Sequence, residues 1–188
     1  TRDAGNRDAF VAMVRAAIGV EPEVISGAQE AALSYAGAVG GLPALLGERA
    51  PILLADIGGG STEVVRGAAG AVQAAHSMNV GCVRLTERRL HDDPPTAAQI
   101  DAAVADVEAA LDAAAADVAL SGASAFVGVA GTVTTLAAIV LGLPAYDPAA
   151  IHGSTMTADQ VEEVAARMLG MTRAQRAALA VMHPGRVD

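Results

Sequence analysis

The pattern of apolar and polar positions alternates along the chain between helical and extended segments. Apolar residues three or four positions apart, or apolar runs opened by a turn, predict helices over 6–19, 27 to about 39, 82–90, 97 to about 118, 131 to about 143, and after 157 and 172. Short β-branched or continuous apolar runs predict strands at 23–25, 52–55, 63–66, 71–79 and 125–130, with 152–156 also extended. Strands and helices that alternate in this way are typical of an α/β fold.

Polar residues at the helix starts support these boundaries. Ser26, Thr96, Thr157 and Thr172 each stand three residues before a Gln, which is the capping-box arrangement that closes a first helical turn. Asn6 is expected to cap the first helix and Gly19 to end it. The longest helix is expected to turn one apolar stripe toward the core; its members are Ile100, Val104, Val107, Leu111 and Val118.

Composition limits the classes of protein that this chain can represent. Its 188 residues, 53% of them hydrophobic, suffice for one domain or two small ones, and its 45 alanines and lack of Trp predict a core of small side chains. A net charge of -9 argues against a general nucleic-acid binder. Cys82 is the one cysteine, so no intrachain disulfide forms, and a reducing, cytoplasmic setting is expected. We find no apolar run of the roughly 20 residues that a membrane span needs, and no signal peptide.

The segment from Asp56 to Glu63 carries the strongest chemical signal. Asp56 ends an apolar strand, where a carboxylate is costly unless it is paired, binds a metal or faces a cleft. The glycines that follow, Gly58, Gly59 and Gly60, let backbone amides approach a ligand closely. Ser61 and Thr62 then lead into a strand-like run, so the segment predicts a β-hairpin rather than a dinucleotide or Walker-type loop. It suits a phosphate held by amides beside a carboxylate that holds a cation, although a plain hairpin with a flexible tip is the alternative.

A second glycine element joins a predicted strand to a helix. Gly128, Gly131 and Thr132 fall where a helix N-terminus offers amide donors to an anion, but close packing of strand against helix explains the same glycines equally well. Glu30 lies in a first helical turn, where the helix dipole alone accounts for a carboxylate. Glu63 faces either a cleft or solvent. Among the basic residues Arg2 and Arg84 are the candidates for phosphate contacts.

Taken together, these motifs resemble the exopolyphosphatase/guanosine pentaphosphate phosphohydrolase (Ppx/GppA) family, actinobacterial type. That family belongs to the superfamily of actin, sugar kinases and the Hsp70 ATPase domain. The matching strings cover nearly the whole chain: Arg2-Asp3-Ala4-x-Asn6, Ser26-Gly27-x-x-Glu30-Ala31, Asp56 to Glu63, Gly81 to Glu87, Gly128-x-x-Gly131-Thr132 and His183 to Arg186.

The resemblance implies a ribonuclease H-like actin-ATPase fold of two lobes. Residues 1–40 would end the first lobe, 41–50 would link the lobes, and 51–188 would form most of the second. The family's first phosphate loop, Asp-x-Gly-Ser/Thr-Asn-Ser, is not found in the sequence. We therefore expect this polypeptide by itself to be a poor enzyme or an inactive one.

The resemblance also implies a role for each candidate residue. Glu30 would be the general base, and Asp56 would place Mg²⁺ (or Mn²⁺) with Glu63 nearby. Phosphate contacts would come from Arg2, from the hairpin loop and from the second glycine element; these residues are Gly58, Gly59, Gly60, Ser61, Thr62, Gly128, Gly131 and Thr132.

The implied reaction releases terminal phosphate from polyphosphate, or converts guanosine pentaphosphate to tetraphosphate. A non-catalytic sensor of the same ligands is the alternative. A sugar or acetate kinase relative is a third, which the Ser26-Gly27-x-x-Glu30-Ala31 string disfavours. The acidic segment offers no long basic channel, so short polyphosphate is the expected substrate. No nucleic-acid or membrane partner is expected, and a homodimer is possible because relatives are often dimers.

Overall fold

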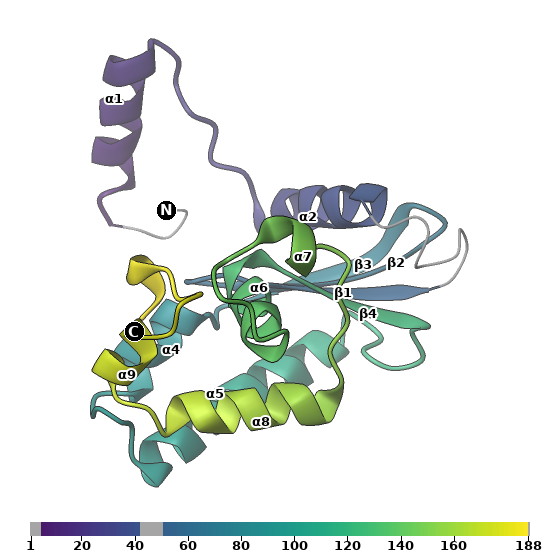
Figure 1. The fold of residues 1–188 in the computed structure, drawn as a ribbon. Helices are drawn as coiled ribbons and strands as arrows, with labels where there is room; N and C mark the ends of the chain where they lie inside the picture. Colours follow the sequence, from purple (N-terminus) through teal and green to yellow (C-terminus); the bar gives the residue numbers. More distant parts are fainter. Residues whose placement is uncertain (1–4, 42–50, 188) are drawn as a thin grey trace.

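The computed structural model describes residues 5–41 and 51–187, and within them one mixed sheet organises the fold (Figure 1). Its strands lie in the order β3-β2-β1-β4. β1 (Ile52–Ile57), β2 (Thr62–Ala68) and β3 (Ala71–Met78) form an antiparallel meander, and β4 (Ala125–Val129) pairs in parallel with β1. The predicted hairpin around the glycine loop is therefore confirmed as the β1–β2 connection.

Helices account for most of the remaining described residues. They are α1 (Arg7–Ile18), α2 (Gly27–Gly41), α4 (Cys82–Arg89), α5 (Ala97–Ala115), α6 (Ala130–Val140), α7 (Pro148–Ile151), α8 (Ala158–Leu169) and α9 (Arg173–Ala177), with a 3₁₀ turn at Pro184–Arg186. Both hydrogen bonds of each predicted capping box are present, at Ser26, Thr96, Thr157 and Thr172. Gly19 ends α1 in the left-handed region as expected, whereas the side chain of Asn6 makes no cap hydrogen bond.

Two helices cover opposite faces of the sheet. Ala31 and Tyr35 of α2 pack against Leu54 and Val65 on one face. Ala114 of α5 joins the cluster on the other face, together with Leu53, Ala55 and Val64. Because side chains alternate along a strand, this division assigns each position of β1 and β2 to one of the two layers. A third cluster, formed by Ala137, Ala138, Ile151 and Val181, joins α6 and α7 to the C-terminal part of the chain.

Helix α1 stands apart from this core. It has no buried residue, and Figure 1 shows it joined to α2 by an extended segment. Met13 and Ile18 are 65% and 67% exposed. The division into lobes stays a prediction, and most of the predicted linker (residues 42–50) lies outside the described residues.

Several predicted elements differ from the structure. Residues 23–25 form no strand, because no described strand lies beside them to pair with. Residues 152–156 pair with no described strand, although His152 has the extended backbone that was expected, and they follow a short helix, α7, that the sequence did not reveal. The continuous apolar run at 125–130 predicts a buried strand, but β4 lies at the sheet edge, where Phe126 is 70% exposed.

The apolar stripe of α5 is only partly confirmed. Val118 is buried, but it lies beyond the end of the helix, and Val104 and Leu111 are exposed. No helix among the described residues is long and apolar enough to cross a membrane.

The contact between Tyr35 and Gly67 yields a stability prediction. The Tyr35 ring lies directly over Gly67, where an added Cβ would stand 2.2 Å from Cζ of the ring. Burial raises the pKa of the Tyr35 phenol, and its hydroxyl has no hydrogen-bond partner among the described residues. Gly67→Ala must displace the ring, so we expect the free energy of unfolding to fall by about 1–3 kcal/mol in urea titrations.

Gly37→Ala is the matched control for this substitution. Gly37 lies within α2, and a Cβ there meets nothing within 4 Å. Replacing an exposed helical glycine by alanine raises stability by roughly 0.5–1 kcal/mol. Equal effects of the two substitutions would contradict the packing described here.

Candidate functional site

A pocket of about 640 Å³ brings together most of the residues that the sequence singled out. Three parts of the chain line it: the segment around α1 and the start of α2, the glycine hairpin, and α4. The lining residues are Phe10, Pro22, Glu23, Val24, Ile25, Glu30, Asp56, Gly58, Gly59, Gly60, Ser61, Glu63 and Arg84.

Asp56 and Glu63 face each other across the hairpin. They are direct partners in the antiparallel register of β1 and β2, so their side chains lie on the same face of the sheet. That face is the one covered by α2, since Ser34 of α2 donates a 2.5 Å hydrogen bond to Oδ2 of Asp56. Glu63 is 1% exposed and accepts a 2.7 Å hydrogen bond from the hydroxyl of Ser77. The uncertainty over the direction of Glu63 is therefore resolved: it faces the pocket.

This pair of carboxylates fits a divalent cation. Neither forms an ion pair with a basic residue among the described residues, and a carboxylate as buried as Glu63 is costly without a compensating charge. Mg²⁺ commonly takes one or two carboxylates and keeps several waters. The described residues contain no group of three or more Asp, Glu, His or Cys side chains that could hold a metal, so Glu30 is not a third ligand beside the pair.

The glycine loop is oriented by hydrogen bonds to α4. The carbonyl of Gly58 accepts from the amide of Cys82 at 3.0 Å, and that of Gly59 from the amide of Arg84 at 3.0 Å. The carbonyl of Gly60 accepts from Nε of Arg84 at 2.7 Å. Three successive carbonyls thus point toward α4.

The amides of the loop must then point the other way. In a planar trans peptide the N–H of each residue is antiparallel to the carbonyl of the residue before it, and the loop has no cis bond. The amides of Gly59, Gly60 and Ser61 consequently point away from α4, and in the described part of the chain they donate no backbone hydrogen bond. A row of such donors is suited to binding an anion such as phosphate.

The short distance between the loop and α4 depends on Gly81. A Cβ at Gly81 would stand 2.6 Å from the carbonyl oxygen of Gly59 and 2.8 Å from that of Gly58. The Cβ of any larger residue at this position would clash with the backbone of the loop. Gly81 is buried at the N-cap of α4. The need for close contact with the loop therefore explains the glycine that begins the Gly81 to Glu87 string.

Glu30 lines the pocket from α2. Its amide donates to the carbonyl of Ser26 at 2.9 Å, and the Ser26–Gln29 capping box fixes the turn that holds it. Ser34, which contacts Asp56, lies one turn later on the same side of the helix. The side chain of Glu30 is half-buried, so it lies at the border between the pocket and solvent.

Some predicted site residues do not line this pocket. Thr62 is buried behind the loop. Gly128, Gly131 and Thr132 lie at the β4–α6 junction, and Arg2 lies outside the described residues. A Cβ at Gly128 would stand 2.8 Å from Val133, and one at Gly131 would stand 1.8 Å from the guanidinium carbon of Arg186. Close packing thus accounts for both glycines, and their phosphate role stays a prediction.

Sequence reasoning missed the residues that hold the carboxylates. Ser34 was detectable, because it stands four positions after Glu30 on the same helical face. Ser77 needed the β2–β3 register, in which it is the partner of Glu63. No local pattern identifies Phe10 as a pocket residue, because its place in the lining depends on how the chain runs between α1 and α2.

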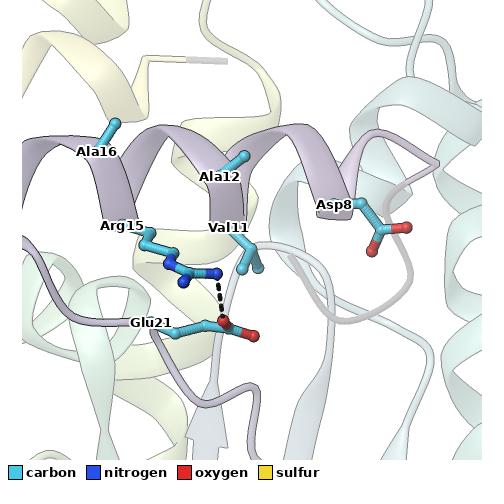
Figure 2. Close-up of a pocket in the computed structure, with 6 residues that line it drawn as sticks. All are labelled: Asp8, Val11, Ala12, Arg15, Ala16 and Glu21. Carbon is cyan, nitrogen blue, oxygen red and sulfur yellow. Dashed lines mark hydrogen bonds and ion pairs between the residues drawn. The ribbon is translucent and has the colours of Figure 1, made fainter.

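A second hollow, of about 610 Å³, lies along α1, and Figure 2 shows the residues that line it. Arg15 and Glu21 form an exposed 3.3 Å ion pair there, and Asp8 lies in the first turn of the helix. None of the predicted site residues lines this hollow.

Comparison with known proteins identifies the family. The sequence model of the Ppx/GppA phosphatase family matches residues 1–188, so the chain belongs to that family. It is 49% identical over 192 residues to exopolyphosphatase 2 of Mycobacterium tuberculosis, covering all of this chain and 59% of that protein. It is 32% identical over 179 residues to guanosine-5'-triphosphate,3'-diphosphate pyrophosphatase of Vibrio cholerae, covering 92% of this chain and 35% of that protein.

Solved structures agree with this assignment. An exopolyphosphatase-like protein superimposes with a TM-score of 0.91 at 42% identity, over 99% of this chain and 59% of the other. The Ppx/GppA family member of Aquifex aeolicus superimposes with a TM-score of 0.82 at 28% identity, over 99% and 58%. The fold is therefore the actin-like ATPase fold predicted from the sequence. The chain spans less than two thirds of the length of these relatives.

The contact between Gly81 and the loop is testable through stability. Gly81→Ala forces α4 and the glycine loop apart, and we expect the free energy of unfolding to drop by about 1–3 kcal/mol. Gly59→Ala is the matched control, because a Cβ there would stand 3.2 Å from a methyl group of the exposed Val83 side chain and not against backbone. In the same denaturant titration, Gly59→Ala should lower the free energy of unfolding clearly less than Gly81→Ala does. A larger loss for Gly59→Ala than for Gly81→Ala would refute the account of how the loop is held.

Proposed function

We propose that the protein hydrolyses phosphoanhydride bonds, releasing terminal phosphate from polyphosphate or converting guanosine pentaphosphate to tetraphosphate. The observation that carries this proposal is the convergence, in one pocket, of a row of backbone amides, a pair of carboxylates and Glu30. Family membership and the names of the relatives support the reaction class. Phosphoryl transfer asks little covalent chemistry of the protein, and mainly needs positioning and charge stabilisation.

In this proposal the glycine loop holds the terminal phosphoryl group. The amides of Gly59, Gly60 and Ser61 would donate to its oxygens, and the hydroxyl of Ser61 lies at the same turn. Such donors are fixed before the substrate arrives, so they stabilise the growing negative charge without reorganising.

Asp56 and Glu63 would hold Mg²⁺ or Mn²⁺ beside the loop. When bound, the cation would neutralise charge on the phosphate oxygens of the substrate. Ser34 and Ser77 keep the two carboxylates oriented, through the hydrogen bonds that each donates. This second layer limits the freedom of the ligands and thereby favours binding of the ion.

Glu30 would act as the general base. A water in line with the leaving oxygen attacks the terminal phosphorus, the bridging P–O bond breaks, and the water gives up a proton to the Glu30 carboxylate. Glu30 suits this role because it lines the pocket from α2, an element separate from the hairpin, and does not belong to the carboxylate pair.

The setting and substrate range belong to the same proposal. The described pocket lining holds four acidic side chains and one basic one, and this balance favours short polyphosphate over long chains. We propose that the protein acts in the cytoplasm, where the free thiol of Cys82 is stable. We also propose that residues 1–40 belong to the first lobe. A ligand sensor without turnover is the competing function, and the following experiment separates the two.

Glu30→Gln in the complete protein should abolish hydrolysis while leaving binding intact. Removal of a general base lowers kcat by about 100- to 10,000-fold. The measurements are phosphate release from tripolyphosphate and calorimetric binding of the same compound. Glu23→Gln, which changes another acidic residue lining the pocket, is the control and should retain activity. Wild-type protein that binds tripolyphosphate but releases no phosphate would establish the sensor instead.

Phosphate release should also depend on a divalent cation. Removing the ion with EDTA should stop the reaction, and adding Mg²⁺ or Mn²⁺ should restore it. Asp56→Asn weakens one of the two carboxylate ligands, so we expect about a 10- to 100-fold higher Mg²⁺ concentration for half-maximal rate. Asp92→Asn, in an exposed turn, is the control. Full activity in EDTA would exclude the metal role of the pair.

A further inference from the structure

The charge of the pocket presents a problem for any phosphorylated ligand. Its lining includes four carboxylates, from Glu23, Glu30, Asp56 and Glu63, and Arg84 is the cationic side chain among the described lining residues. A divalent ion balances at most the carboxylate pair. A polyanion therefore needs a further positive group beside the glycine loop.

Arg84 occupies that position. Its amide donates to the carbonyl of Gly59, and its Nε donates to that of Gly60 at 2.7 Å. Its Nη2 lies 3.7 Å from the point where a Cβ on Gly60 would stand, so the guanidinium lies along the loop. In the described part of the chain, Arg84 forms no ion pair, unlike its helix neighbours Arg88 and Arg89, which both bind Asp106.

We propose that Arg84 is a phosphate-binding residue of this site, an inference that rests on the proposed function. Its Nε fixes the loop, while its terminal nitrogens bind phosphate oxygens of the same ligand on the α4 side of the loop, where Arg84 lines the pocket. A guanidinium is suited to this double task because its donors are rigidly arranged and it remains charged at every working pH. The same side chain thereby orients the amides and supplies the missing positive charge.

Two substitutions separate the two tasks of the side chain. Arg84→Gln keeps an amide nitrogen at the place of Nε, able to bind the Gly60 carbonyl, but removes the charge. Arg84→Lys keeps the charge but loses the donor at that place. We expect Arg84→Gln to raise KM for tripolyphosphate by about 10- to 100-fold, the usual effect of losing charge-assisted hydrogen bonds. Arg84→Lys should raise it less.

The opposite order would overturn the proposal, because a purely structural role predicts near-normal Arg84→Gln and impaired Arg84→Lys. Unchanged KM in both variants overturns it as well. Arg84→Ala offers a second readout: added guanidinium should recover part of the affinity, whereas urea, which is neutral and of the same shape, should not. Recovery by both, or by neither, contradicts a charge role.

Arg88→Gln is the matched control, since it changes an arginine of the same helix that pairs with Asp106 outside the pocket. It should leave KM unchanged. If wild-type protein releases no phosphate, the proposed hydrolysis fails, and Arg84 is then judged by calorimetric binding of tripolyphosphate to the wild type and to Arg84→Gln. Equal affinity in that comparison would reject the role of Arg84 independently of hydrolysis.

Discussion

The hydrogen bonds between the glycine loop and the start of α4 determine what this site can bind. A helix begins with amides that lack intrahelical partners, and here the loop carbonyls accept from two of them. The same bonds leave the loop amides directed elsewhere. One set of contacts thus satisfies the helix start and creates the row of donors. The close approach that it requires explains why glycine stands at position 81.

Helix α2 provides the second constraint on the site. Its capping box fixes where the helix begins, and Tyr35 anchors its buried side on the sheet. Between these two points lie Glu30 and Ser34, so both are held relative to the strands. The carboxylate pair and Glu30 consequently come from separate elements whose relative position is set by a packed core rather than by loops. This rigidity is what the proposed phosphoryl transfer would require for positioning its reactants.

Local signals in the sequence predicted most of the fold, while long-range pairing produced the errors. Capping boxes, the glycine hairpin and the strand-to-helix turn at Gly131 depend on neighbouring residues and were found. The edge position of β4 and the absence of a strand at 23–25 depend on which segments lie side by side, which periodicity does not report. The same division holds at the site: Asp56 and the loop were found from local pattern, whereas Ser77 became visible only through the register of β2 and β3.

The hairpin register also restricts how the loop can change. Asp56 and Glu63 share a face only because four residues, 58–61, separate the paired ends of β1 and β2. Inserting or deleting one residue there, if the strands slipped by one position, would turn Glu63 to the opposite face, among Leu53 and Ala55 in the apolar layer beneath α5. Substitutions can therefore alter the chemistry of the loop step by step, whereas a change in its length would separate the two carboxylates at once.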